Sequence, residues 1–290
     1  MATGPRSPKP LADVPTSRAI VNLAVGAVVF YGALVGGVYL IQRSLMYAPG
    51  TDIPVPEASG VPEMRPVRVT TSDGVTLTSW YRPAAQGMPT VVFFHGNAGH
   101  IGHRGFKART FLDAGYGLVL VGYRGYGGNP GSPTEEGFYA DGRAVLELLA
   151  RNGVAASRMV LYGESLGTGV AVHLALEAAR AGVPVGAVVL EAPFDSMAEM
   201  ARYHYPYLPA YWLVKDRYES VAKIDRIGSP LFLLHGGRDQ VVPSIFGRKL
   251  FQAARDPKEL LVLPEADHND LFEHGAGEKV VLFLRKVLVL

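Results

Sequence analysis

The chain has 290 residues, of which 48% are hydrophobic, and its formal net charge at pH 7 is +2. This length suits one α/β domain with a full core plus an appended segment. The net charge is small and the basic residues are scattered, which argues against nucleic acid as a partner. Cysteine is absent, so a disulfide, a thiolate nucleophile and a palmitoylated cysteine are excluded.

The first predicted element is a membrane-spanning helix. From Ala19 to Ile41 the chain carries no charged residue, and Asn22 is its only strongly polar side chain. At 1.5 Å per residue, a helix of this length crosses the hydrocarbon core of a bilayer. A cleavable signal peptide has a shorter apolar region, roughly 7–15 residues, and an A-x-A-like cleavage site, neither of which is present. We therefore expect a tail over residues 1–18, a transmembrane signal-anchor helix over 19–42 and a linker over 43–64.

Basic residues flank this helix unequally. Arg6, Lys9 and Arg18 precede it, whereas Arg43 stands alone in the twenty residues that follow. Because the more basic flank stays in the cytoplasm, we expect a cytoplasmic tail and a periplasmic or otherwise extracytoplasmic domain. A G-x-x-x-G pair within the helix leaves a dimerising face open, so the oligomeric state is not predicted.

The remainder of the chain alternates short apolar runs with helical patterns. This alternation predicts an α/β domain with a mostly parallel sheet and helices on both faces. Two runs of alternating polarity, 65–71 and 75–81, flank Ser72-Asp73-Gly74 and predict an antiparallel hairpin at the start of the domain.

The pattern Gly163-Glu164-Ser165-Leu166-Gly167 stands between an apolar run over 158–162 and a helical pattern over 170–176. A G-x-S-x-G between a strand and a helix forms a nucleophile elbow, a tight turn that lifts a serine hydroxyl clear of the backbone. The pattern alone is a weak signal, but this context strengthens it. Ser165 is therefore the candidate nucleophile.

A serine nucleophile needs a base, and the base needs an orienting acid. In α/β-hydrolases the acid and then the histidine follow the serine along the chain, after later strands. Asp239 follows an apolar run over 230–235, and His268 follows another over 260–263. These positions predict Asp239 as the acid and His268 as the base, against a helix-capping aspartate and an inert loop histidine. Asp195 is an alternative position for the acid.

An oxyanion hole needs backbone N–H groups aimed at developing negative charge. One donor usually follows the nucleophile and another comes from the loop after an earlier strand. Leu166 is the first candidate. Asn97 is the second, because it lies in the His95–Gly99 loop after an apolar run over 90–94.

Two further patterns have competing interpretations. His95, His100 and His103 lie within nine residues, but no cysteine or carboxylate spacing completes a zinc site. The glycine-rich stretch from Arg124 to Gly131 lacks the Gly-Lys-Ser/Thr ending of a phosphate-binding loop. We expect it to form a tight loop beside the site, and we expect neither a metal ion nor a cofactor.

The chain also resembles a known family, the membrane-anchored α/β-hydrolases of the bud-emergence (Bem) type, which are related to α/β-hydrolase domain proteins with depalmitoylase members. The resemblance extends from about Leu45 to Leu284. It implies an α/β-hydrolase catalytic domain over residues 65–290, after one transmembrane helix, with a short cap insertion at about 194–224. The motifs that carry the resemblance are SLMYAP (44–49), HGNAG (95–99), YRGYG (123–127), GSPTEEG (131–137), GESLG (163–167), EAPF (191–194), HGGRD (235–239) and HND (268–270).

The expected cap is rich in aromatic residues, which could hold an acyl chain or pack the insertion onto the core. The sequence leaves both interpretations open. The aromatic residues are Tyr203, Tyr205, Tyr207, Tyr211, Trp212 and Tyr218.

The combined prediction is a serine hydrolase that cleaves carboxylic esters or thioesters through an acyl-enzyme. Ser165 attacks, His268 carries the proton, Asp239 orients His268, and the amides of Asn97 and Leu166 hold the oxyanion. A peptidase or amidase using the same residues is one alternative, and a non-catalytic, membrane-tethered binding protein is another. The expected partner is a small-molecule or lipid acyl ester, whose identity and chain length the sequence leaves open.

Overall fold

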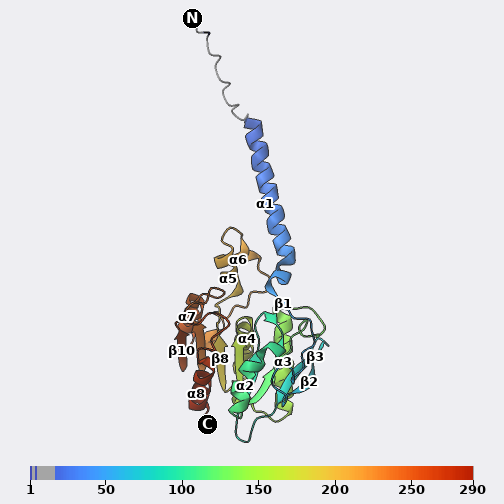
Figure 1. Cartoon of the computed structure of the whole chain (residues 1–290), viewed down its shortest axis with the longest axis vertical. Helices are drawn as coiled ribbons and strands as arrows, with labels where there is room; N and C mark the ends of the chain where they lie inside the picture. Colours follow the sequence, from blue (N-terminus) through green and yellow to red (C-terminus); the bar gives the residue numbers. More distant parts are fainter. Residues whose placement is uncertain (2–3, 5–16, 290) are drawn as a thin grey trace. The chain divides into compact units, whose positions relative to one another are not determined.

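The structure is a computed structural model that describes residues 1, 4 and 17–289. These residues form two compact units, Met1–Ile41 and Gln42–Leu290. Most of the predicted tail over 1–18 lies outside the described residues. Figure 1 shows the helix α1 and the mixed α/β unit that follows it.

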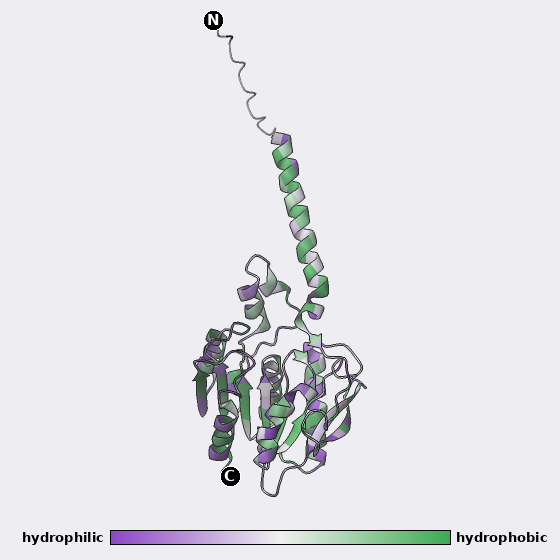
Figure 2. Cartoon of the chain, in the orientation of Figure 1, coloured by the Kyte–Doolittle hydropathy of each residue, from purple (hydrophilic) through white to green (hydrophobic). Residues whose placement is uncertain are grey.

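Helix α1 (Ser17–Met46) is the N-terminal apolar helix. By length and composition it could cross a membrane, and none of its side chains is buried. Figure 2 shows the apolar character along most of its length. The helix continues past the predicted end at residue 42, so its last turn belongs to the second unit.

The second unit is built on an eight-stranded sheet with the order β10-β9-β8-β7-β4-β6-β3-β2. The pairings from β10 to β6 are all parallel, and β3 pairs antiparallel with both β6 and β2. The strands are β2 (Arg65–Thr70), β3 (Thr76–Arg82), β4 (Thr90–Phe94), β6 (Gly117–Leu120), β7 (Met159–Glu164), β8 (Ala187–Glu191), β9 (Leu231–Gly236) and β10 (Lys258–Leu263).

Helices cover both faces of this sheet, which is why every residue of β4 and β7 is buried. One apolar cluster joins the sheet to α3, α4 and α7, and the other joins it to α2 and α8. The predicted α/β-hydrolase fold with a mostly parallel sheet is confirmed. The helices are α2 (Gly105–Asp113), α3 (Glu135–Arg151), α4 (Leu166–Arg180), α7 (Ser244–Ala253) and α8 (Ala276–Leu288), with short 3-10 turns η1 (Ile101–Arg104), η2 (Ala156–Arg158) and η3 (Ile224–Arg226).

Residues 43–64 differ from the linker that the sequence predicts. Tyr47, Val61 and Met64 are buried in the second unit. The two-residue strand β1 (Ala48–Pro49) pairs in parallel with β5 (Ala98–Gly99), directly after the loop that follows β4. Prolines suggested a spacer, but the buried apolar side chains before, between and after them pack this segment onto the domain. This segment is therefore an integral part of the second unit.

The expected cap insertion contains two short helices, α5 (Met197–His204) and α6 (Ala210–Leu213). In Figure 1 they project from the same end of the domain as β1. Of the six aromatic residues expected there, only Tyr218 is fully buried, where its hydroxyl lies 3.0 Å from that of Tyr47.

Candidate active site

Ser165 stands at the sharp turn between β7 and α4. Its backbone has φ 49° and ψ −115°, a left-handed conformation that a non-glycine residue adopts only under constraint. The flanking glycines permit the turn. A Cβ at Gly163 would lie 2.5 Å from the Thr168 Cα, and one at Gly167 would lie 2.0 Å from the Phe94 carbonyl oxygen. The local geometry is that of the predicted nucleophile elbow.

The three side chains of the predicted triad meet at the carboxyl ends of the strands. The His268 Nε2 lies 3.1 Å from the Ser165 Oγ, and its Nδ1 lies 2.7 Å from the Asp239 Oδ2. Ser165 follows β7, Asp239 follows β9, and His268 follows β10. The contacts form an unbroken hydrogen-bonded line from hydroxyl to imidazole to carboxylate, as proton transfer between serine and histidine requires.

Asp239 is held as a buried carboxylate. Its Oδ1 accepts hydrogen bonds from the backbone amides of Val241, at 2.9 Å, and Val242, at 2.7 Å. Burial by itself raises the pKa of Asp239, but hydrogen bonds from His235 and His268 outweigh it and hold the pKa well below the usual range. The group therefore stays ionised and can orient and stabilise a protonated His268.

His235 is a contributor that the sequence reasoning missed. Its Nε2 lies 2.7 Å from the Val242 carbonyl oxygen and 3.4 Å from the Asp239 Oδ2. Because a carbonyl oxygen only accepts, the Nε2 carries a proton, which it donates to Val242 while lying beside the Asp239 carboxylate. His235 opens the HGGRD motif, which was the signal for this contact.

Asp195 occupies a different environment. It is fully buried, and its carboxylate accepts hydrogen bonds from the Lys249 ammonium and from the Ser196 amide. The carboxylate that contacts His268 is that of Asp239, whereas the two oxygens of Asp195 are held by other donors.

The predicted oxyanion donors border the nucleophile. A Cβ at Gly96 would lie 3.5 Å from the Ser165 Cβ, so the loop carrying Asn97 passes close to the serine. Leu166 begins α4, where backbone amides have no intrahelical partner. Within the part of the chain that the structure describes, neither the Asn97 nor the Leu166 amide donates to a protein group.

Asn97 is fixed by contacts that the sequence reasoning did not identify. Its carbonyl oxygen accepts from the Ala48 amide at 3.1 Å and from the Tyr126 hydroxyl at 2.7 Å. Its side-chain amide donates to the Met46 carbonyl oxygen at 3.0 Å. The end of α1 and the strand β1 thus hold a residue of the site. The SLMYAP and YRGYG motifs contained these partners.

A buried charge network lies behind the elbow. Glu164, next to Ser165, accepts from the Arg104 Nη2 at 2.6 Å and from the Lys107 Nζ at 3.0 Å. Lys107 also donates to Glu191 at 2.7 Å. Burial opposes ionisation of Glu164, but Lys107 and Arg104 outweigh burial and lower its pKa. Ion pairing therefore satisfies these groups and fixes the end of β7.

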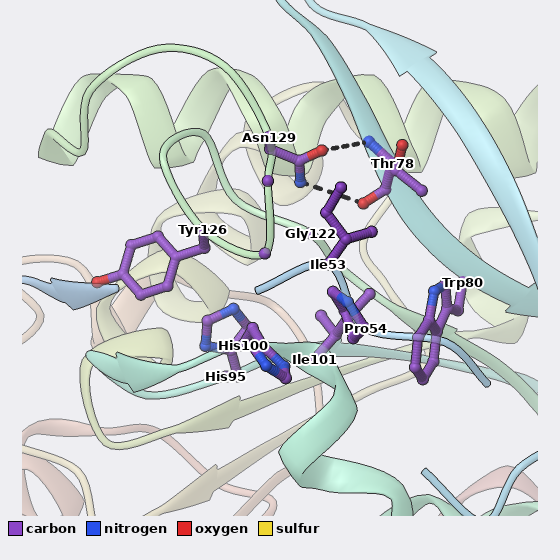
Figure 3. Close-up of a pocket in the computed structure, with 12 residues that line it drawn as sticks. Ile53, Pro54, Thr78, Trp80, His95, His100, Ile101, Gly122, Tyr126 and Asn129 are labelled. Carbon is purple, nitrogen blue, oxygen red and sulfur yellow. Dashed lines mark hydrogen bonds between the residues drawn. The ribbon is translucent and has the colours of Figure 1, made fainter. Parts of the chain in front are cut away.

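Two hollows adjoin the site. The first, shown in Figure 3, has a volume of about 120 Å³ and lies beside the loop that follows β4. On another of its walls, the Asn129 side chain is hydrogen-bonded to the backbone of Thr78. It is smaller than ordinary ligand pockets, and no triad residue lines it. The second, about 410 Å³, is lined by neighbours of the site residues, among them Ala98, Glu164 and Asn269. No triad residue is among those that line this depression either, but Glu164 and Asn269 directly adjoin Ser165 and His268 in the chain. It is therefore the better candidate of the two for a substrate cleft.

The three clustered histidines have separate surroundings. Burial lowers the pKa of His95 to about 3, and its Nδ1 lies 2.8 Å from the Gly96 carbonyl oxygen. The His100 Nε2 bonds to Asp52, and its ring stacks on that of His103 at 4.0 Å between centroids. Among the described residues, no three histidine or carboxylate side chains are arranged to hold a metal ion.

The glycine-rich stretch from Arg124 to Gly131 uses its backbone groups internally. The Gly125 amide donates to the carbonyl oxygens of Asn129 and Pro130, and the Gly127 amide donates to that of Gly50. The loop touches the site through the Tyr126 hydroxyl, which bonds to Asn97.

Comparisons with known proteins identify the family of the chain. A sequence family described as "Serine aminopeptidase, S33" (Hydrolase_4) matches residues 86–220. The "Uncharacterized protein Rv2307c" of Mycobacterium tuberculosis is 40% identical over 257 residues, which cover 87% of this chain and 89% of that protein. The chain belongs to the Hydrolase_4 family of α/β-hydrolases.

Characterised relatives match a smaller part of the chain. The "Lysophosphatidylserine lipase ABHD12" of Danio rerio is 34% identical over 197 residues, which cover 62% of this chain and 51% of that protein. Among solved structures, the esterase Pf2001 of Pyrococcus furiosus has a TM-score of 0.66 at 24% identity, covering 84% of this chain and 98% of that one. This likeness shows the fold, and the family supports a hydrolase.

Proposed function

We propose that the protein is a serine hydrolase that cleaves carboxylic esters or thioesters through an acyl-enzyme. Ser165 attacks the carbonyl carbon while His268 takes its proton, and His268 then returns the proton to the leaving group. Asp239 stabilises the protonated His268. The amides of Asn97 and Leu166 donate to the oxyanion. The observation that carries the proposal is the hydrogen-bonded line from the Ser165 hydroxyl through His268 to Asp239.

The proposed substrates are acyl esters with an apolar chain, including lipid esters. The name of the zebrafish relative, a lysophosphatidylserine lipase, supports this substrate class. The depression beside the site offers an acyl chain one large apolar contact, the ring of Phe106, which is more than half exposed, whereas its other walls are largely polar. The resemblance to families with depalmitoylase members adds thioesters to the proposal.

A peptidase is the second candidate, because the matching sequence family is described as serine aminopeptidases. An aminopeptidase must bind a substrate ammonium group near the nucleophile. The carboxylate next to Ser165 is that of Glu164, and Arg104 and Lys107 already neutralise it. This pairing favours esters. Rates on an ester and an amide with the same acyl group would separate the two candidates.

The direct test is covalent labelling of the full chain. A fluorophosphonate probe should modify Ser165, and Ser165→Ala should abolish both labelling and ester hydrolysis, a loss of roughly 10⁴-fold or more, because triad members act as a unit. Ser157→Ala is the matched control, since Ser157 lies in η2 before β7. Undiminished labelling of Ser165→Ala would overturn the assignment. Labelling of neither protein would favour a non-catalytic binding protein.

We further propose that α1 anchors the protein in a membrane with the hydrolase domain on the extracytoplasmic side. The apolar character of α1 supports the anchor, and the basic residues before it support the orientation. Protease added to intact cells with a permeable outer envelope should digest the domain. Digestion only after lysis of the inner membrane would reverse the orientation.

A further inference from the structure

The cap carries an aromatic surface that the domain does not bury. Trp212 is 77% exposed, Tyr207 66%, Tyr203 56% and Tyr205 49%. We refer to these four residues as the cap aromatic surface. The edge of this surface contacts the core, where the ring of Tyr203 packs against the buried Phe246 at 5.5 Å between centroids. None of the four residues is among those that line the two hollows beside the site. The rings of Tyr205 and Tyr207 contact each other, and α5 packs against α6, which carries Trp212. Exposed aromatic residues that gather in this way mark an interaction surface.

The end of the apolar helix is bonded to residues that directly follow Trp212 in the cap. The Gln42 side chain donates to the Leu213 carbonyl oxygen at 3.2 Å and accepts from the Lys215 amide at 2.7 Å. Arg43 forms a two-pronged ion pair with the buried Asp216, at 2.7 and 2.9 Å. Two successive residues at the end of the apolar helix are therefore bonded to the last residue of α6 and to the segment that follows it.

This connection ties one point of the cap to the residue that follows the uncharged run. The uncharged run ends at Ile41. If that run crosses the membrane, Gln42 lies at the membrane surface, and its bonded partner Leu213 lies at the same level. Trp212 is the residue before Leu213. Tryptophan and tyrosine are the side chains that favour this interfacial layer, where the ring is half in lipid and the polar edge is hydrated.

We propose that the cap aromatic surface rests in the interfacial layer of the bilayer that the chain's own apolar helix enters. The proposal rests on the anchoring part of the proposed function and is independent of the chemistry at Ser165. Its consequence is that the cap faces the lipid from which an acyl ester would come, so the site is presented to substrates in the membrane surface.

Tryptophan fluorescence tests the proposal, because the chain has only two tryptophans. Trp80, in β3, is 1% exposed. The full chain would be reconstituted in phosphatidylcholine vesicles in which one acyl chain carries bromine near the headgroup. We expect bromine to quench a substantial part of the wild-type emission, compared with unlabelled vesicles. The Trp212→Phe variant reports Trp80 alone and should lose little emission.

The outcomes are distinct. Equal quenching of wild type and Trp212→Phe would overturn the docking. Shielding of Trp212 from aqueous acrylamide without quenching by bromine would overturn it in favour of a protein partner, such as a second copy. An alkaline carbonate wash checks the anchor separately. Protein that washes off the vesicles refutes the anchor, and the docking with it, whereas fluorophosphonate labelling still tests the hydrolase.

A kinetic comparison adds a functional readout. Trp212→Ser should leave kcat/KM for a soluble short-chain ester unchanged, because the side chain does not contact Ser165 or its partners. The same variant should lower the rate on an ester embedded in vesicles several-fold. Equal losses on both substrates would mean that Trp212 supports the fold or the site, and equal rates on both would mean that the surface does not contact lipid.

Discussion

The strand ends that carry Ser165, Asp239 and His268 differ from the segments that surround them, residues 42–64 and the cap. At the strand ends, short motifs fix both the backbone and the chemistry, because each side chain lies on the turn or loop that follows a strand of the parallel part of the sheet. In the surrounding segments, the amino-acid composition is evident from the sequence, but the residues to which each side chain is hydrogen-bonded are not. There the contacts join residues far apart in the chain, such as Asn97 with Met46 and Arg43 with Asp216. Local sequence patterns therefore identify the reacting side chains more readily than they identify the residues that position those side chains.

The largest effect should come from replacing the acid at the strand ends. Asp239→Asn keeps an oxygen for the Val241 and Val242 amides but removes the charge that stabilises protonated His268. We expect kcat on a soluble ester to fall by about 10⁴-fold, the scale of triad aspartate loss. Asp195→Asn is the matched control, since it breaks a contact with Lys249 and none with His268. A greater loss of activity in the control would show that the acid is misassigned.

A smaller effect should come from the surrounding segments. Ala48→Pro removes the N–H that donates to the Asn97 carbonyl oxygen, so the loop loses one of its fixed contacts. Because displacement of an oxyanion donor by even 1 Å can cost about 10²-fold, we expect kcat to fall about 10- to 100-fold. KM should change little.

Ala48→Ser is the control for this prediction. It keeps the N–H, and the side chain at this position is exposed, so its kcat should match that of the wild type. Thermal unfolding of both variants would show whether a fall in kcat comes from displacement of Asn97 or from unfolding of the domain. Wild-type kcat in Ala48→Pro, with the protein folded, would mean that β1 does not position Asn97.

The sequence was sufficient for the sheet, the elbow and the grouping of the three side chains, because alternation of strands and helices and the order of motifs are local properties. It was insufficient for α1, whose apolar run ends at Ile41 while the helix continues to Met46. Hydropathy reports apolar character and not the hydrogen bonds that Gln42 and Arg43 make with the cap. His235 was missed for a related reason. Its contact with Asp239 depends on how the loop after β9 folds back.

The smallest effect concerns stability beside the site. His95 is fully buried, and its Nε2 has no hydrogen-bond partner among the described residues. A proton there would place an unpaired charge in the interior, which is why burial lowers the pKa of His95 to about 3. The unfolded chain, with an ordinary histidine pKa near 6.5, therefore binds this proton more readily than the folded chain does.

Between pH 6.5 and 3, the free energy of unfolding should consequently decrease as the pH falls, by at most about 1.4 kcal/mol per pH unit from this one group. The measurement is thermal or denaturant unfolding of the full chain in detergent from pH 7 to 4.5. His95→Gln should reduce the slope, whatever its effect on stability at pH 7. Ser157→Ala, in the turn η2, is the control, because it changes no titratable group and should leave the slope unchanged. Equal slopes in wild type and His95→Gln would mean that the folded chain binds the His95 proton as readily as the unfolded chain does. The prediction would then be wrong.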